Sequence, residues 1–156
     1  MTELYELEEQ AERLVLVGVA VGDEVTAQDS LAELAELVET AGGLPVVQFI
    51  QNRAGFDIAT YIGSGKVAEL KQYLVMMDAD GIVCDDELTP SQMNNLEREL
   101  EVKILDRTMV ILDIFAARAS TREGKIQVEL AQLRYRSTHL IGMGGILSRQ
   151  GGGTGT

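Results

Sequence analysis

Residues 13–21 read Arg-Leu-Val-Leu-Val-Gly-Val-Ala-Val, an almost unbroken apolar run rich in valine. A run of this length and composition predicts a strand that is buried on both faces of a sheet. A helix is expected next, over residues 30–41, because Ser30 and Glu33 have the spacing of a capping box. The apolar residues of this segment share one face, and glycines follow it. A second apolar run at residues 44–50 predicts another strand directly after this helix.

The alternation of strands and helices continues beyond the second strand. The sequence predicts, in order, a loop at 52–57, a helix at 64–77, a strand at 81–85, a helix that begins at Thr89 and a strand at 102–105. The helix start is well marked, because Thr89 supplies a capping hydroxyl, Pro90 fits the first helical position and Gln92 completes a capping box. The expected fold class is therefore α/β, with a small parallel four-stranded sheet flanked by helices and joined by right-handed crossovers.

The pattern changes after Asp106. Residues 109–119 are apolar and helical, and Ser120 with Glu123 predicts the cap of a long helix that runs to about Leu140. One stripe of this helix carries Ile126, Leu130, Leu133, Ser137 and Leu140. A stripe of this kind needs a partner helix, so we interpret the segment as the first half of an interrupted helical hairpin.

Seven of the 16 glycines fall in residues 142–156, a composition that cannot build a core. We therefore divide the chain into an α/β subdomain at 1–106, a helical extension at 107–141, and a glycine-rich flexible loop or tail at 142–156. The open apolar stripe of the long helix also suggests that two copies of this fragment associate as a homodimer, in which each copy supplies the partner helix that the other lacks.

Composition limits the classes of protein that the chain can represent. The 156 residues suffice for one ordinary domain and an appendage, and 46% of them are apolar. No run approaches the ~20 apolar residues of a membrane helix, and the start of the sequence is acidic rather than a basic signal region. The single cysteine, Cys84, excludes an internal disulfide and predicts a small buried residue in a strand. A cytoplasmic protein is expected.

The net charge of −12 is unevenly distributed along the chain. Residues 1–102 contain 5 Lys and Arg against 21 Asp and Glu, whereas residues 103–156 contain 8 against 4. Phosphate binding requires local rather than global positive charge, so the basic end remains compatible with a nucleic-acid partner. An unevenly charged but merely solvated surface would explain the composition equally well.

Gly63, Ser64, Gly65 and Lys66 invite interpretation as a phosphate-binding loop. A complete Walker motif would have glycine at position 60 and a hydroxyl residue at position 67, where this sequence has threonine and valine. A glycine turn into a helix is the better interpretation, although backbone amides at a helix start attract anions by themselves. The four residues are therefore a possible anion-binding site.

The residues at 85–87 are three consecutive acids after a strand, where open α/β sheets place their ligands and where Mg²⁺ could bind. An ordinary acidic loop before a helix is the more common explanation. His139 is the only histidine, so the chain has no pair of histidines for a metal site and no serine or cysteine catalytic triad. No catalytic residue and no metal site are predicted.

The last constellation is basic and rich in glycine. Its members are Arg134, Tyr135, Arg136, His139, Ser148, Arg149, Gln150, Gly151, Gly152 and Gly153. Arginine pairs with phosphates, tyrosine can stack on an unpaired base, and glycines let the backbone approach RNA closely. From composition alone the segment could be a linker as readily as an RNA-binding tip.

Longer motifs occur along the chain in a fixed order. They are YIGSGKV at 61–67, DDEL at 85–88, DRT at 106–108, ILDIFA at 111–116, TREGK at 121–125, QVELAQL at 127–133 and LSRQGGGTGT at 147–156. Together they resemble the HflX family of GTPases, and the resemblance spans residues 13–156. It implies that the chain is the amino-terminal part of such a protein, followed in the complete protein by a second long helix and by a GTPase domain that binds GTP and Mg²⁺.

The resemblance implies a ribosome-associated protein whose amino-terminal part docks on the large subunit and its rRNA. The family is linked to splitting or rescuing stalled ribosomes under stress, notably heat stress, and its glycine-rich loop reaches toward the peptidyl-transferase region. Carried onto this sequence, the RNA-contacting positions are Ser148, Arg149, Gln150, Gly151, Gly152 and Gly153. Relatives often end the long helix with an apolar-Pro-Arg-Leu motif, whereas Arg136, Ser137, Thr138 and His139 precede Leu140 here, which makes this end more hydrophilic.

Two alternatives to ribosome binding follow from the residues. The α/β body could bind a nucleotide at residues 63–66 and hydrolyse it weakly, or it could regulate the absent GTPase domain in cis through its surface. We expect this chain itself to hold no cofactor and to have no enzymatic activity.

Overall fold

The computed structural model describes residues 11–142, and the side chains of residues 11–137. Its elements are β1 (Arg13–Ala20), α2 (Glu24–Thr40), β2 (Leu44–Asn52), α3 (Ser64–Met76), β3 (Gly81–Cys84), α4 (Pro90–Leu100), β4 (Lys103–Asp106), α5 (Arg107–Arg118) and α6 (Arg122–Gly142). All four predicted strands and the predicted helices are present. Within the described residues, no helix combines the length and the apolar composition needed to cross a membrane.

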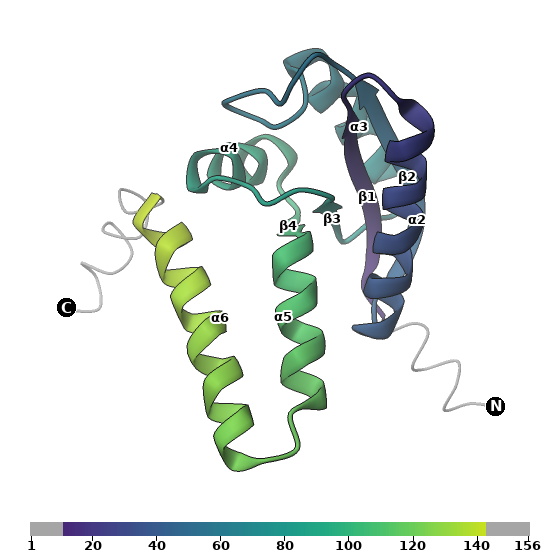
Figure 1. Ribbon diagram of the computed structural model, residues 1–156. Helices are drawn as coiled ribbons and strands as arrows, with labels where there is room; N and C mark the ends of the chain where they lie inside the picture. The colour runs from purple at the N-terminus through teal and green to yellow at the C-terminus, as the bar shows by residue number, and fades with distance from the viewer. Residues whose placement is uncertain (1–10, 143–156) are drawn as a thin grey trace.

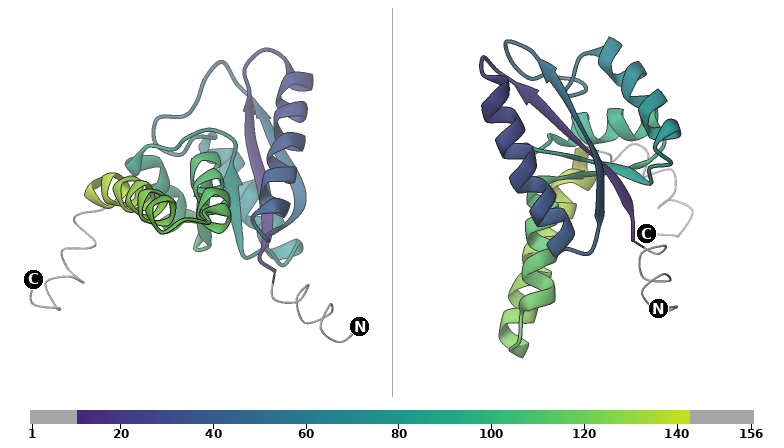
Figure 2. Two further views of the ribbon diagram at one scale, coloured as in Figure 1. Left: turned by 60° about the horizontal axis from the view of Figure 1, so that its bottom comes forward. Right: turned by 90° about the vertical axis from the view of Figure 1, so that its right-hand side faces the viewer.

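The four strands form one parallel sheet in the order β2-β1-β3-β4, which confirms the α/β prediction. β1 lies at the centre, and its continuous apolar sequence is explained by burial on both faces. The close approach of β3 and β4 depends on Gly81, because a Cβ atom there would lie 2.4 Å from the backbone oxygen of Lys103. Helices cover both faces of the sheet (Figures 1 and 2).

Side chains that alternate along the strands divide the core into two layers. On one face, β1 and β3 pack against α3 and α4, through a cluster that includes Val15, Val17, Leu70, Ile82 and Leu96. On the other face they pack against α2 and α5, through Leu14, Leu16, Leu34, Val83 and Ile114. Because all four strands are parallel, their carboxyl ends lie at a single edge of the sheet, where the helices that follow them begin.

Two helix starts differ from the prediction. α2 begins at Glu24, capped by Asp23, whose side chain accepts a hydrogen bond from the backbone N–H of Val25. The predicted cap, Ser30, lies inside this helix and its hydroxyl bonds another element instead. Similarly, Thr121 rather than Ser120 stands at the start of α6, since its hydroxyl accepts from the backbone N–H of Gly124 at 2.9 Å. The caps of α4 are as predicted, with both hydrogen bonds of the capping box formed.

α5 and α6 form an antiparallel pair that projects from the α/β body (Figure 1). The side chain of Gln132 donates to Asp113 across the pair, and α6 also contacts α4. The predicted stripe of α6 remains open, because Ile126, Leu130 and Leu133 are 47%, 46% and 58% exposed. The half-buried residues of α6, such as Val128 and Tyr135, lie on the opposite side of the helix.

Candidate functional site

The carboxyl edge of the sheet contains a topological switch point between β1 and β3, from which the two connections leave in opposite directions. Open α/β sheets place ligands in the crevice at such a point. Here Arg107, at the start of α5, spans the crevice. Its Nη2 lies 3.0 Å from Asp85 Oδ1 after β3, and its Nη1 lies 3.2 Å from Glu33 Oε1 on α2. Burial opposes the charge of Arg107, but the hydrogen bond and attraction to Asp85 outweigh it and raise the pKa of the guanidinium.

The second oxygen of Asp85 accepts a hydrogen bond of 2.5 Å from the Oγ of Ser30, which lies inside α2. Arg107 also donates to the backbone oxygen of Ser30 at 3.1 Å. The two ion pairs of Arg107 and the hydrogen bonds beside them therefore join α2, β3 and α5 where a ligand would otherwise sit.

Asp86, the next residue, is tied to the loop before α3. The hydroxyl of Tyr61, whose side chain is buried, donates to Asp86 Oδ2 at 2.5 Å. Burial raises the pKa of Asp86, a shift that the hydrogen bond from Tyr61 opposes. Burial likewise raises the pKa of the Tyr61 hydroxyl far above its usual value.

Asp106, the last residue of β4, is fully buried and accepts three hydrogen bonds. Its Oδ1 accepts from the backbone N–H of Met109 at 3.0 Å and so caps α5, while Oδ2 accepts from the backbone N–H of Leu88 at 3.0 Å. The third donor is the hydroxyl of Tyr135 on α6. Burial, followed by this hydrogen bond, raises the pKa of Tyr135.

These contacts decide whether the three acidic residues at 85–87, where Mg²⁺ could bind, are available to a cation. The carboxylates of Asp85 and Asp86 already bond protein donors, and Glu87 is exposed. Among the residues whose side chains are described, no group of three or more His, Cys, Asp or Glu is placed to hold a metal ion. The acidic segment therefore fits a structural junction better than a cation site. Cys84 beside it is buried, as expected, and burial raises the pKa of its thiol.

The segment Gly63, Ser64, Gly65 and Lys66 forms the start of α3, with Gly63 as the cap. The backbone N–H of Gly63 donates to Gln51 Oε1 at 2.8 Å. Lys66 turns along the helix to pair with Glu69 at 3.0 Å and lies over the ring of Phe49. Val67, at the position of the Walker hydroxyl, is buried in the core. This geometry matches a glycine turn into a helix. It lacks the Mg²⁺-binding hydroxyl that a phosphate-binding loop for a nucleoside triphosphate has.

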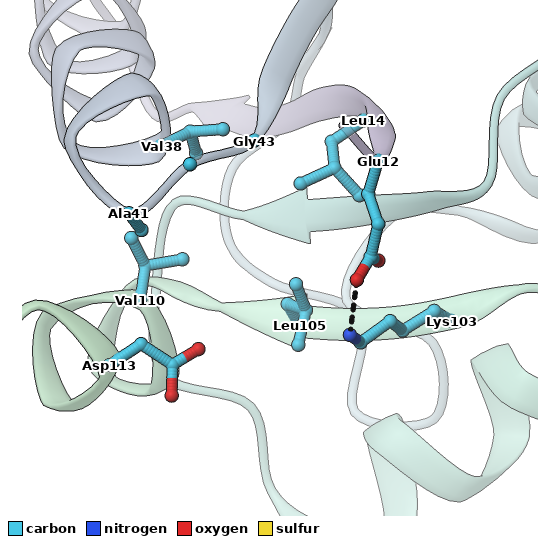
Figure 3. A pocket seen from close by; sticks show the side chains of 10 residues that line it. Glu12, Leu14, Val38, Ala41, Gly43, Lys103, Leu105, Val110 and Asp113 are labelled. Carbon is cyan, nitrogen blue, oxygen red and sulfur yellow. Dashed lines mark hydrogen bonds and ion pairs between the residues drawn. The ribbon is translucent and has the colours of Figure 1, made fainter. Parts of the chain in front are cut away.

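A separate pocket lies near the opposite edge of the sheet, between the end of α2 and α5 (Figure 3). Leu14, Leu105 and Val110 form its apolar wall, and an ion pair of 2.9 Å between Lys103 and Glu12 borders it. Besides this neutralised pair, the pocket is lined by the exposed carboxylate of Asp113, which accepts a hydrogen bond from Gln132. The pocket carries no functional assignment.

The basic residues of α6 are presented to solvent. Arg134 and Arg136 are exposed, on the part of α6 that leads toward the glycine-rich segment. Tyr135 between them is half-buried and donates its hydroxyl to Asp106, and its stacking on a base stays a prediction. The side chain of His139 and all of Ser148, Arg149, Gln150, Gly151, Gly152 and Gly153 lie outside the described residues.

Sequence reasoning missed the roles of Arg107, Asp106, Tyr61 and Tyr135. The only sequence signal for Asp106 and Arg107 was their place in the DRT motif at 106–108, one of the motifs that resemble the HflX family. The partner of each tyrosine lies more than 20 residues away along the chain, so no local pattern pairs them.

The family described as GTP-binding GTPase N-terminal matches residues 28–116, and the family described as GTP-binding GTPase Middle Region matches residues 118–156. GTPase HflX of Lacrimispora saccharolytica is 61% identical to this chain over all 156 residues of the chain. The chain belongs to the HflX family of GTPases.

Other HflX proteins support the same assignment. GTPase HflX of Caldanaerobacter subterraneus is 49% identical over 97% of this chain, and that of Escherichia coli is 39% identical over 99%. The chain spans 37%, 35% and 35% of the lengths of these three relatives, or about a third of each.

Solved structures agree with the HflX fold. A GTP-binding protein from the archaeon Sulfolobus solfataricus in complex with GDP superposes with a TM-score of 0.61 at 26% identity, over 86% of this chain and 40% of that one. A second structure, of SsGBP in complex with GDP, gives a TM-score of 0.62 at 26% identity, over 81% of this chain and 36% of that chain.

Proposed function

We propose that this chain is the ribosome-binding part of an HflX GTPase, and that it contacts large-subunit rRNA through the basic end of α6 and the segment that follows. The observation that carries the proposal is the exposure of Arg134 and Arg136 in the later turns of α6, the helix that precedes the glycine-rich residues in the sequence. The planar guanidinium groups of exposed arginines are accessible to phosphates and match their geometry.

The distribution of charge supports this choice of surface. α2 carries five carboxylates and no basic side chain, so its face repels a polyanion. α6 carries four basic side chains and two acidic ones, and Arg149 adds a further positive charge beyond it. Phosphate contacts dominate the affinity of most nucleic-acid complexes, so RNA should meet α6 rather than α2.

We assign RNA contact to Arg134, Arg136, His139, Ser148, Arg149 and Gln150, with Gly151, Gly152 and Gly153 allowing close backbone approach. The chain itself acts as a binding module in the cytoplasm, where ribosomes are available. GTP and Mg²⁺ belong to the GTPase domain of the complete protein, which this chain would position on stalled ribosomes during splitting or rescue under stress.

Sedimentation with isolated large subunits tests the proposal. The variant combines Arg134→Ala, Arg136→Ala and Arg149→Ala, and the charge-matched control combines Lys71→Ala, Arg98→Ala and Arg118→Ala, three exposed basic residues away from this end. We expect the first variant to bind more weakly and the control to bind like the parent.

The salt dependence of binding gives a second readout. Each lost phosphate contact lowers the magnitude of the slope of log affinity against log salt by about 0.7–0.9, so three lost contacts should lower it by roughly 2–3. If the Arg134, Arg136 and Arg149 variant sediments as well as the parent and with the same slope, the RNA surface assigned here is wrong.

A further inference from the structure

α6 is attached to the rest of the molecule with little burial. None of its side chains at positions 122–137 is fully buried, whereas every other helix of the described region contributes buried side chains to the core. The apolar residues Ile126, Leu130 and Leu133 lie on the side of α6 opposite its half-buried residues and leave about half of their surface exposed. The orientation of α6 must therefore depend on a few specific contacts.

Two of these contacts are hydrogen bonds to carboxylates. Gln132 donates to Asp113 at 3.0 Å, but both side chains reach solvent, where such a bond adds little stability. Tyr135 donates to Asp106, which is fully buried at the end of β4. Asp106 is itself fixed by the backbone N–H groups of Leu88 and Met109, so the acceptor cannot follow a moving helix.

We propose that Tyr135 is a positioning residue, whose hydrogen bond to Asp106 holds the basic end of α6 in a fixed orientation on the α/β body. Arg134 and Arg136 flank Tyr135, so the same turn of helix that presents the arginines is anchored by the tyrosine between them. This inference rests on the proposed function for its consequence in RNA binding, but the anchoring itself does not.

Tyr135→Phe removes the hydroxyl and keeps the ring. Its matched control is Tyr61→Phe, which removes the other tyrosine hydroxyl that donates to a carboxylate, in a loop of the α/β body. Hydrogen exchange of the backbone amides of α6 measures the anchoring without any ribosome. We expect exchange on the order of tenfold faster in α6 of Tyr135→Phe, because a hydrogen bond to a carboxylate changes an equilibrium constant by at least about that factor. Tyr61→Phe should leave α6 unchanged.

Binding to isolated large subunits measures how the loss of the Tyr135 hydrogen bond affects RNA binding. Tyr135→Phe should lower the affinity several-fold while the slope against salt stays that of the parent, because both arginines are still present to contact phosphates. Removal of the arginines lowers the slope, so loss of position and loss of contact are distinguished. Tyr61→Phe should bind like the parent.

The outcomes separate the two proposals. Unchanged exchange in α6 of Tyr135→Phe overturns the anchoring, whatever the ribosome assay gives. Faster exchange with parental affinity overturns the positioning role. If the parent chain does not sediment with large subunits at all, the proposed function fails, and the exchange measurement alone still decides whether Tyr135 anchors α6.

Discussion

At the scale of single residues, the pKa values of Asp57 and Asp86 are shifted in opposite directions at the same edge of the sheet. Backbone N–H groups of Thr60 and Ala59 donate to Asp57 and lower its pKa from 3.8, whereas burial raises the pKa of Asp86 from the same value. The folded state is therefore stabilised by the ionised form of Asp57 and by the protonated form of Asp86.

The two groups should therefore give opposite pH dependences of the free energy of unfolding. The contribution of Asp57 is complete above pH 3.8 and is lost as the pH falls through its lowered pKa. We expect the parent to be more stable than Asp57→Asn at neutral pH, with the difference closing in acid. Asp86 contributes most below pH 3.8, and its contribution is lost as the pH rises through its raised pKa.

Urea denaturation of the parent, Asp57→Asn and Asp86→Asn across this range measures both differences. Relative to Asp86→Asn, the parent should gain stability as the pH falls. Two differences that change in the same direction with pH would contradict these assignments.

At the scale of the elements, the start of α6 separates two candidate caps. Thr121 accepts from the backbone N–H of Gly124, so Thr121→Ala should destabilise the first turn by about 1 kcal/mol. Ser120→Ala should change it by a few tenths at most, since substitutions away from such features are usually small. Hydrogen exchange at residues 122–126 would show the difference, and an equal response of both variants would contradict the observed cap.

The elements also show what could be predicted from sequence. The buried strands and α4 were predicted because apolar runs and the motif at Thr89 are local signals. The start of α2 was missed because Asp23 and Ser30 both have the chemistry of a cap, and only tertiary structure commits Ser30 to Asp85. The basic side chains of α6 are visible in the sequence and their role in RNA binding stays a prediction, whereas the hydrogen bond of Tyr135 to Asp106 depends on packing between distant segments.

At the scale of the whole molecule, the chain should not turn over GTP. Lys66 is paired with Glu69, and Val67 is buried where a Mg²⁺-binding hydroxyl would be required. We expect phosphate release by the parent to equal that of Lys66→Ala, with and without Mg²⁺. Turnover by the parent above that variant would favour the alternative in which residues 63–66 bind a nucleotide.

The open stripe of α6 predicts weak self-association. Ile126, Leu130 and Leu133 are each about half exposed, and burying the remainder is worth roughly 1 kcal/mol per side chain. An antiparallel two-fold pairing would cover both stripes. Analytical ultracentrifugation should detect a concentration-dependent dimer that Leu130→Glu combined with Leu133→Glu abolishes.

Val75→Glu is the matched control for the dimer, because Val75 is an 80% exposed apolar residue on α3. It should associate like the parent. A parent chain that stays monomeric at high concentration would exclude the pairing.

The separation of α2 from α6 gives the molecule an electric polarity. α2 carries only acidic charge, α6 carries an excess of basic charge, and the two helices lie on opposite sides of α5 (Figure 1). A charged surface that approaches such a dipole exerts a torque on it, so the molecule rotates before any atoms touch. Over distances within a Debye length, about 8 Å at physiological ionic strength, a polyanion would turn α6 toward itself and α2 away. Encounters that begin in the wrong orientation are thus corrected during approach rather than lost.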